Sequence, residues 1–82
     1  MAAENIQEIL SALTEMRDDP TVPRNIKTKV STILGIMGED SDILIRVNKA
    51  LNELDDISDD TNMQAYTRTQ VWNIVSLLES IH

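Results

Sequence analysis

The sequence predicts an all-α fold, a four-helix bundle made of two tandem helical hairpins, and three observations lead to this prediction. Apolar residues recur every three or four positions along the whole chain, which is the helical period. The 82 residues include one Trp, one Tyr and no Phe, with two Gly and two Pro, a composition that suits packed aliphatic helices better than a sheet. A similar segment also occurs twice, 41 residues apart.

Each predicted helix carries one apolar stripe. We expect helices at about 3–17, 22–37, 42–58 and 63–81. The four stripes are Ile6, Ile9, Leu10, Leu13 and Met16; Ile26, Val30, Ile33, Leu34 and Met37; Val47, Ala50, Leu51, Leu54 and Ile57; and Thr67, Val71, Ile74, Val75 and Leu78.

Turn residues separate the stripes. The Asp-Asp-Pro segment 18–20 ends the first helix, because proline cannot continue it. Thr21 is expected to cap the second helix, with Pro23 in its first turn, and Gly38 to end it in a left-handed conformation. Asp40 or Ser41 is expected to cap the third helix and Asn62 the fourth.

A shift of 41 residues aligns 6–37 with 47–78 without a gap. The alignment matches Asp18-Asp19 with Asp59-Asp60, Thr28 with Thr69 and Val30 with Val71. We therefore predict a single domain, 1–82, with a first repeat at about 1–40 and a second at about 41–82, each a hairpin of about the length of a HEAT-type repeat. Two such hairpins are too few for a solenoid, so we expect them to close on each other as a bundle.

The segments "DDPTVPRNIK" (18–27) and "TRTQVWNIVSLLE" (67–79) carry a resemblance to a known family. Over essentially its full length, the chain resembles the small archaeal helical proteins numbered 0147 among families of unknown function. The resemblance implies a compact helical fold, and it brings no assigned activity and no catalytic residues.

Composition and charge argue against several classes of function. The net charge is −7, which disfavours nucleic acid as a partner. The chain lacks cysteine, which fits a reducing cytoplasm, and lacks any apolar run long enough to cross a bilayer, so no membrane association is expected. The one histidine is His82, so serine triad chemistry has no base within the predicted helices. We therefore expect a protein that is not an enzyme and that needs no cofactor.

Two alternatives remain open. The first is a nucleic-acid-associated factor that uses Arg24, Lys27 and Lys29 of the second helix together with Arg68. The second and weaker one is a divalent-metal protein that uses the acidic stretch 53–60, although this stretch lacks the pattern of an EF-hand. Acidic residues ahead of a helix also interact favourably with its dipole, which we prefer as the reason for the paired aspartates.

The fourth helix has more apolar residues than one stripe requires. Trp72 lies about 100° from the centre of the stripe on one side, and Leu77 about 120° on the other, where Tyr66 and Ile81 also lie. Either Trp72 closes one end of the core, or Trp72, Leu77, Ile81 and Tyr66 form an interface. The main prediction is therefore an interaction or adaptor module, whose partner is another protein or a second copy of the chain.

Overall fold

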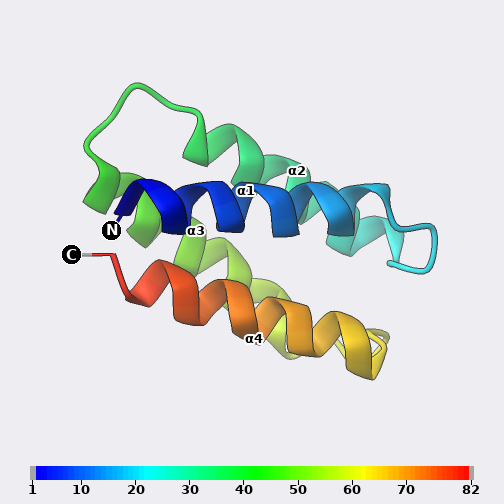
Figure 1. Cartoon of the computed structure of the whole chain (residues 1–82). Coiled ribbons are helices and arrows are strands. Elements are labelled where there is room, and N and C mark those ends of the chain that lie inside the picture. Colours follow the sequence, from blue (N-terminus) through cyan, green and yellow to red (C-terminus); the bar gives the residue numbers. More distant parts are fainter. Residues whose placement is uncertain (1, 82) are drawn as a thin grey trace.

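The computed structural model describes the backbone of residues 2–81 and the side chains of residues 6–81. The four elements are α1 (Ala2–Asp18), α2 (Arg24–Met37), α3 (Ile43–Ser58) and α4 (Ala65–Glu79), and no strand occurs between residues 2 and 81. Successive helices run in opposite directions, so that α1 begins and α4 ends at the same end of the molecule (Figure 1). The predicted all-α four-helix bundle is confirmed.

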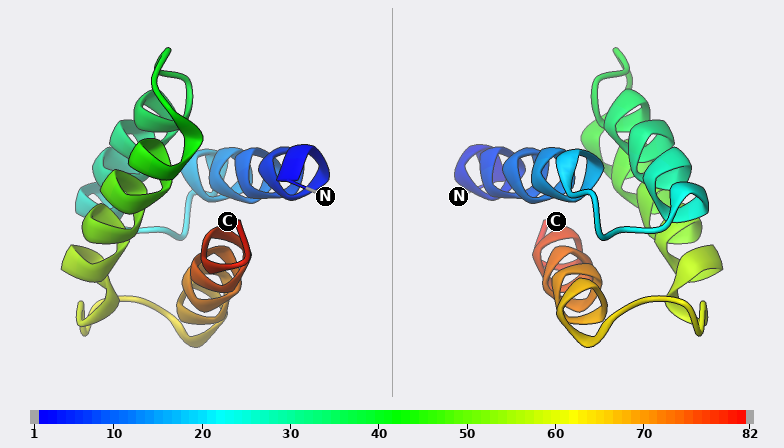
Figure 2. Two further views of the ribbon diagram at one scale, coloured as in Figure 1. Left: turned by 90° about the vertical axis from the view of Figure 1, so that its left-hand side faces the viewer. Right: turned by 90° about the vertical axis from the view of Figure 1, so that its right-hand side faces the viewer.

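Each helix contacts two neighbours and leaves the diagonally opposite helix untouched. The contacting pairs are α1 with α2, α2 with α3, α3 with α4, and α4 with α1. Figure 2 shows α2 and α3 on one side of the molecule, with α1 and α4 on the other. The pair α3 and α4 makes the least extensive contact of the four.

The predicted stripes form one core. Its centre is fully enclosed, because Ile9, Leu13, Ile26, Leu54 and Ile74 have no exposed surface. The turns contribute as well, since one apolar residue from each hairpin turn is buried against the helices. The remaining members of the buried cluster are Met16, Val22, Val30, Ile33, Met37, Val47, Ala50, Ile57, Met63, Val71, Leu78 and Ile81.

The start of α2 differs from the prediction that Thr21 caps it. The N-cap is Pro23, in an extended conformation with ψ 150°, and the helix begins at Arg24. Thr21 instead donates both its backbone N–H (2.8 Å) and its hydroxyl (2.7 Å) to Oδ1 of Asp19. An aspartate that binds the backbone two residues later forms a local turn of its own, which takes the hydroxyl away from the helix.

The start of α4 differs in the same way, so the prediction that Asn62 caps it is wrong. The backbone N–H of Asn62 donates to Oδ1 of Asp60 (2.8 Å), and the N-cap is Gln64, which makes no side-chain capping bond. The two aspartates thus order the turns ahead of these helices.

The connection between α2 and α3 corrects two further predictions. Asp42, and neither Asp40 nor Ser41, caps α3, and its carboxylate accepts the backbone N–H of Leu44 at 2.9 Å. Gly38 has φ −91° and ψ −2°, which is right-handed, so the left-handed ending is wrong. The Gly38 N–H donates to the carbonyl of Leu34, as in an α-helix, and also to that of Gly35, which tightens the last turn.

The two hairpins share their local structure at the predicted offset of 41 residues. Asp19 and Asp60 each accept the N–H two residues later. Thr28 and Thr69 each donate to the carbonyl four residues earlier, at 3.1 and 3.0 Å. These likenesses agree with the alignment, and the internal duplication itself stays a prediction.

No helix within residues 2–81 combines the length and the apolar character that a bilayer-spanning segment requires. The longest helix, α1, has 17 residues and carries charged side chains.

Candidate functional site

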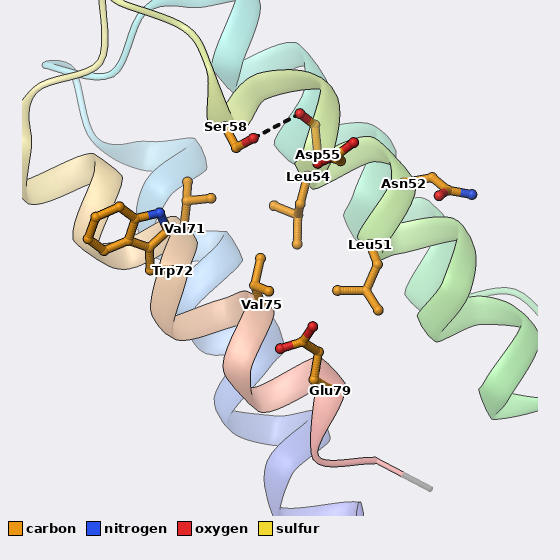
Figure 3. Close-up of a pocket in the computed structure, with 9 residues that line it drawn as sticks. All are labelled: Leu51, Asn52, Leu54, Asp55, Ser58, Val71, Trp72, Val75 and Glu79. Carbon is orange, nitrogen blue, oxygen red and sulfur yellow. Dashed lines mark hydrogen bonds between the residues drawn. The ribbon is translucent and has the colours of Figure 1, made fainter.

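A concave feature that both helices of the second hairpin line lies between α3 and α4, and we call it the α3–α4 groove. It encloses about 400 Å³. Figure 3 shows apolar side chains from both helices pointing into the space between them. The lining residues are Leu51, Asn52, Leu54, Asp55 and Ser58 of α3, and Val71, Trp72, Val75 and Glu79 of α4.

Helical spacing places these side chains. Leu51, Leu54 and Ser58 are three and four residues apart, so they line one side of α3 over two turns. Val71 and Val75 do the same on α4. Leu54 and Val71 are buried and form the floor, whereas Leu51 and Val75 are half-buried and remain accessible to a ligand.

Trp72 lies at the edge of the floor and remains largely in solvent. Its residue surface is 62% exposed, although tryptophan is the largest apolar side chain. The alternative that Trp72 closes one end of the core is therefore wrong. The floor beneath is already filled by Leu54 and Val71, and the indole stands beside it (Figure 3).

The four residues of the predicted interface lie in three different environments. Tyr66 is as exposed as Trp72, at 62%, but it does not line the groove. Leu77 is half-buried and packs against the core. Ile81 is 6% exposed and belongs to the core, because the chain leaves α4 after Glu79 and folds this side chain inward. Of the predicted set, only Trp72 lines the α3–α4 groove.

Of the nine groove residues, the sequence predicts an interface role for Trp72 alone. Helical spacing places Leu51, Val71 and Val75 on the core stripes, and it gives neither Asp55 nor Glu79 a role beside Trp72. One signal was available. Val75, Glu79 and Trp72 lie on the same flank of α4 by helical spacing, so an apolar side facing α3 could have been read there.

The groove carries two carboxylates, from Asp55 and Glu79. Among the described side chains, neither makes an ion pair. The acids on the other flank of α3 differ, because Glu53 and Asp56 each lie 3.2 Å from Nζ of Lys29. Lys29 therefore pairs with acids on the α2 side of α3, whereas Arg68 of α4 bonds to backbone carbonyls at the end of α3 and leaves the Asp55 and Glu79 carboxylates without an ion pair within residues 6–81.

The acidic stretch 53–60 does not converge on one point. Glu53 and Asp56 face Lys29, and Asp60 accepts bonds from Asn62 N–H and from Nδ2 of Asn25 at 2.7 Å. The N–H of Asn62 and then the amide of Asn25 lower the pKa of the Asp60 carboxyl below its ordinary value. Within residues 6–81, no group of three or more histidine, aspartate or glutamate side chains could hold a metal ion.

Two of the four bases of the nucleic-acid alternative bond to groups of the protein itself. Lys29 is bonded to Glu53 and Asp56, which raise the pKa of its amine above the ordinary value. Arg68 donates to the carbonyls of Ser58 (3.1 Å) and Asp60 (3.0 Å), and so caps the end of α3. Arg24 and Lys27 lie on α2, which does not contact the α4 helix of Arg68.

Fold and site together define a small, acidic all-α protein with a groove between α3 and α4 beside an exposed tryptophan. His82, the one histidine, lies outside the described residues.

The chain belongs to the family described as "Uncharacterised protein family (UPF0147)", whose model matches residues 1–81. A UPF0147 protein of Methanosarcina acetivorans is 38% identical over 81 residues, covering 98% of this chain and 84% of its own. One from Archaeoglobus fulgidus is 35% identical over 81 residues, covering 99% and 93%. The relatives are archaeal, as the resemblance implied.

A solved structure also matches. The crystal structure of the "unknown function protein MMP1188" is 42% identical, has a TM-score of 0.92, and covers 98% of this chain and 92% of that chain. It supports the fold described above.

Proposed function

We propose that this protein is a non-enzymatic interaction module that docks another polypeptide in the α3–α4 groove. One observation carries the proposal: a tryptophan that is 62% exposed stands at the edge of an apolar groove of about 400 Å³. Exposed tryptophans beside accessible apolar pockets are frequent anchors of protein interfaces.

The packing of the groove supports the proposal. Leu51 and Val75 are half-buried in the monomer, so a partner can remove their remaining surface from water at a gain of about 25 cal/mol per Å². The bundle does not need Trp72 for its own core, because the enclosed residues already fill it.

The chemistry of the lining residues supports a binding role over catalysis. Four of the nine are aliphatic and a fifth is Trp72, and the hydroxyl of Ser58 is engaged, since it donates to the Asp55 carbonyl at 2.9 Å. The carboxylates of Asp55 and Glu79 can attract positively charged groups of a partner, and this attraction requires no covalent chemistry.

A pair of matched variants tests the proposal. Trp72→Ala and Tyr66→Ala each remove one aromatic side chain of equal exposure from α4, but only Trp72 lines the groove. In affinity capture from the native organism at low salt, we expect Trp72→Ala to lose the specific co-purifying protein and Tyr66→Ala to retain it. Equal retention by both variants, with both folded by circular dichroism, would contradict the proposal.

Self-association is a separate form of the same proposal. Sedimentation over a wide concentration range measures it directly. A dimer that Trp72→Ala dissociates would make the groove's occupant a second copy, whereas a monomer at every concentration would exclude self-association.

A further inference from the structure

We infer that the occupant of the α3–α4 groove is a cationic amphipathic helix from a different protein. This inference rests on the proposed function and names the chemistry of the partner. It follows from the shape of the groove, from the charges that line it, and from the apolar strip that continues beyond it.

The shape of the groove fits a helix. Its α3 side runs from Leu51 to Ser58, and its α4 side from Val71 to Glu79. These spans are about 10 Å and about 12 Å long at the helical rise of 1.5 Å per residue. Two helices side by side offer a trough in which a third helix lays its apolar face, with anchors at positions i, i+3, i+4 and i+7.

The apolar strip extends past the groove along α3. Leu44 lies seven residues before Leu51, which places both on the same side of the helix. Its residue surface is 45% exposed. From Leu44 to Ser58 the strip runs about 21 Å, which matches a partner helix of about 14 residues.

The charges of the groove select a cationic partner. The carboxylates of Asp55 and Glu79 line the groove, and no side chain described in the structure pairs with either. They lie on different helices, toward opposite ends of the groove in Figure 3. Lysine or arginine flanking the apolar stripe of a bound helix would reach both, so the acidic groove complements a basic helix.

The same charges disfavour a second copy of this chain. In a two-fold dimer the same surface faces itself, so Asp55 and Glu79 of one copy would meet those of the other. The protein also has a net charge of −7, which repels its own copies at low salt.

Trp72 makes a direct test possible, because it is the only tryptophan of the chain and lines the groove. The probe is an alanine-based peptide of about 15 residues, with leucines at the i, i+4 and i+7 spacing and flanking lysines. The comparison peptide has glutamates in place of the lysines. We expect the lysine peptide to bind with one-to-one stoichiometry and to shift Trp72 emission to shorter wavelength, and the glutamate peptide not to bind.

Neutral variants separate the groove from the overall charge. Asp55→Asn with Glu79→Gln should weaken binding of the lysine peptide about fivefold, the sum of two exposed ion pairs. Glu8→Gln with Asp40→Asn removes as much charge from exposed positions outside the groove and should leave the affinity within about twofold.

The results distinguish this inference from the proposed function. Equal binding of the lysine and glutamate peptides, or equal weakening by the two double variants, overturns the cationic partner. If instead the chain dimerises and Trp72→Ala dissociates the dimer, the groove still docks a polypeptide but the inference is wrong. If Trp72→Ala changes neither capture nor association, the proposed function itself fails.

Discussion

The two hairpins share their buried residues and differ along their outer faces. Leu13 of α1 and Leu54 of α3 are equivalent at the offset of 41 residues, and both are fully buried. The groove residues diverge. Asp55, Trp72 and Glu79 of the second hairpin stand where the first has Thr14, Ser31 and Gly38.

This difference separates the residues that make the fold from the residues that make the site. Two hairpins that share one core need apolar residues at the core positions of both, since a loss in either one leaves a cavity in the common core. It does not need an aromatic residue and two carboxylates on one outer face. Their presence in the second hairpin alone is what a dedicated docking surface predicts.

The largest expected effect tests the core positions that the two hairpins share. Leu13→Ala and Leu54→Ala each remove a fully buried side chain from the common core. Each should lower the free energy of unfolding by about 3 kcal/mol, from lost burial and the cavity left behind. Urea denaturation measures both. A loss below about 1 kcal/mol in one variant alone would show that the hairpins do not contribute equally.

A smaller effect should distinguish Arg68 from its equivalent, Lys27. The Arg68 guanidinium donates to the carbonyls of Ser58, the last residue of α3, and of Asp60 in the turn that follows. Arg68→Ala should destabilise the fold by about 1–2 kcal/mol, because these carbonyls lose their partner. Lys27→Ala should stay within about 0.5 kcal/mol, as an ordinary surface substitution does. Equal losses of thermal stability in the two variants would contradict the role of Arg68 as the cap of α3.

Much of the fold could be predicted from the sequence, because periodicity and turn residues act locally. The four helices, their order and nearly all core positions follow from the stripes. The capping residues could not be predicted in this way. The carboxylates of Asp19 and Asp60 accept the N–H groups of Thr21 and Asn62, and the preference of Thr and Asn for N-cap positions does not show that such a local turn forms instead.

The candidate site was harder to predict, because it depends on the packing of two helices. Trp72 was identified as unusual, yet Ile81 was placed with it, although the backbone turns Ile81 into the core after α4 ends. Leu51 and Val75 look like core residues in their own helices. They are half-buried, as Leu10 and Leu34 of the first hairpin are, and no single-helix pattern separates such positions from fully buried ones.

The turn between α3 and α4 predicts a response to acid. Hydrogen bonds from Asn62 and Asn25 lower the pKa of Asp60 in the folded state, so its ionised form stabilises the fold. That contribution is present above the ordinary aspartate pKa of about 3.9 and is lost as the pH falls through the lower folded value.

The neighbouring aspartate provides the control for this response. Asp60→Asn should reduce the loss of thermal stability between about pH 5 and pH 2, relative to the wild type. Asp59→Asn should leave that loss unchanged, because the Asp59 side chain makes no hydrogen bond in the described part of the chain. The same acid dependence in all three proteins would contradict the role of Asp60.

The smallest stability effect is expected at the site itself. Trp72→Ala should change the free energy of unfolding by less than about 1 kcal/mol, because most of the indole already lies in water. The same substitution should weaken partner binding about thirtyfold, as loss of an interface anchor does. Chemical denaturation and isothermal titration measure the two quantities. A large loss of stability would show instead that Trp72 contributes to the core.

The most direct test of the docking surface compares the equivalent positions of the two hairpins in living cells. A photo-crosslinking residue, p-benzoylphenylalanine, replaces Trp72 in one variant and Ser31 in the other, and both positions are exposed. Irradiation should crosslink position 72 to a protein other than this chain, and position 31 to no protein. Crosslinking of the same protein at both positions, or at position 31 alone, would contradict the assignment of the α3–α4 groove.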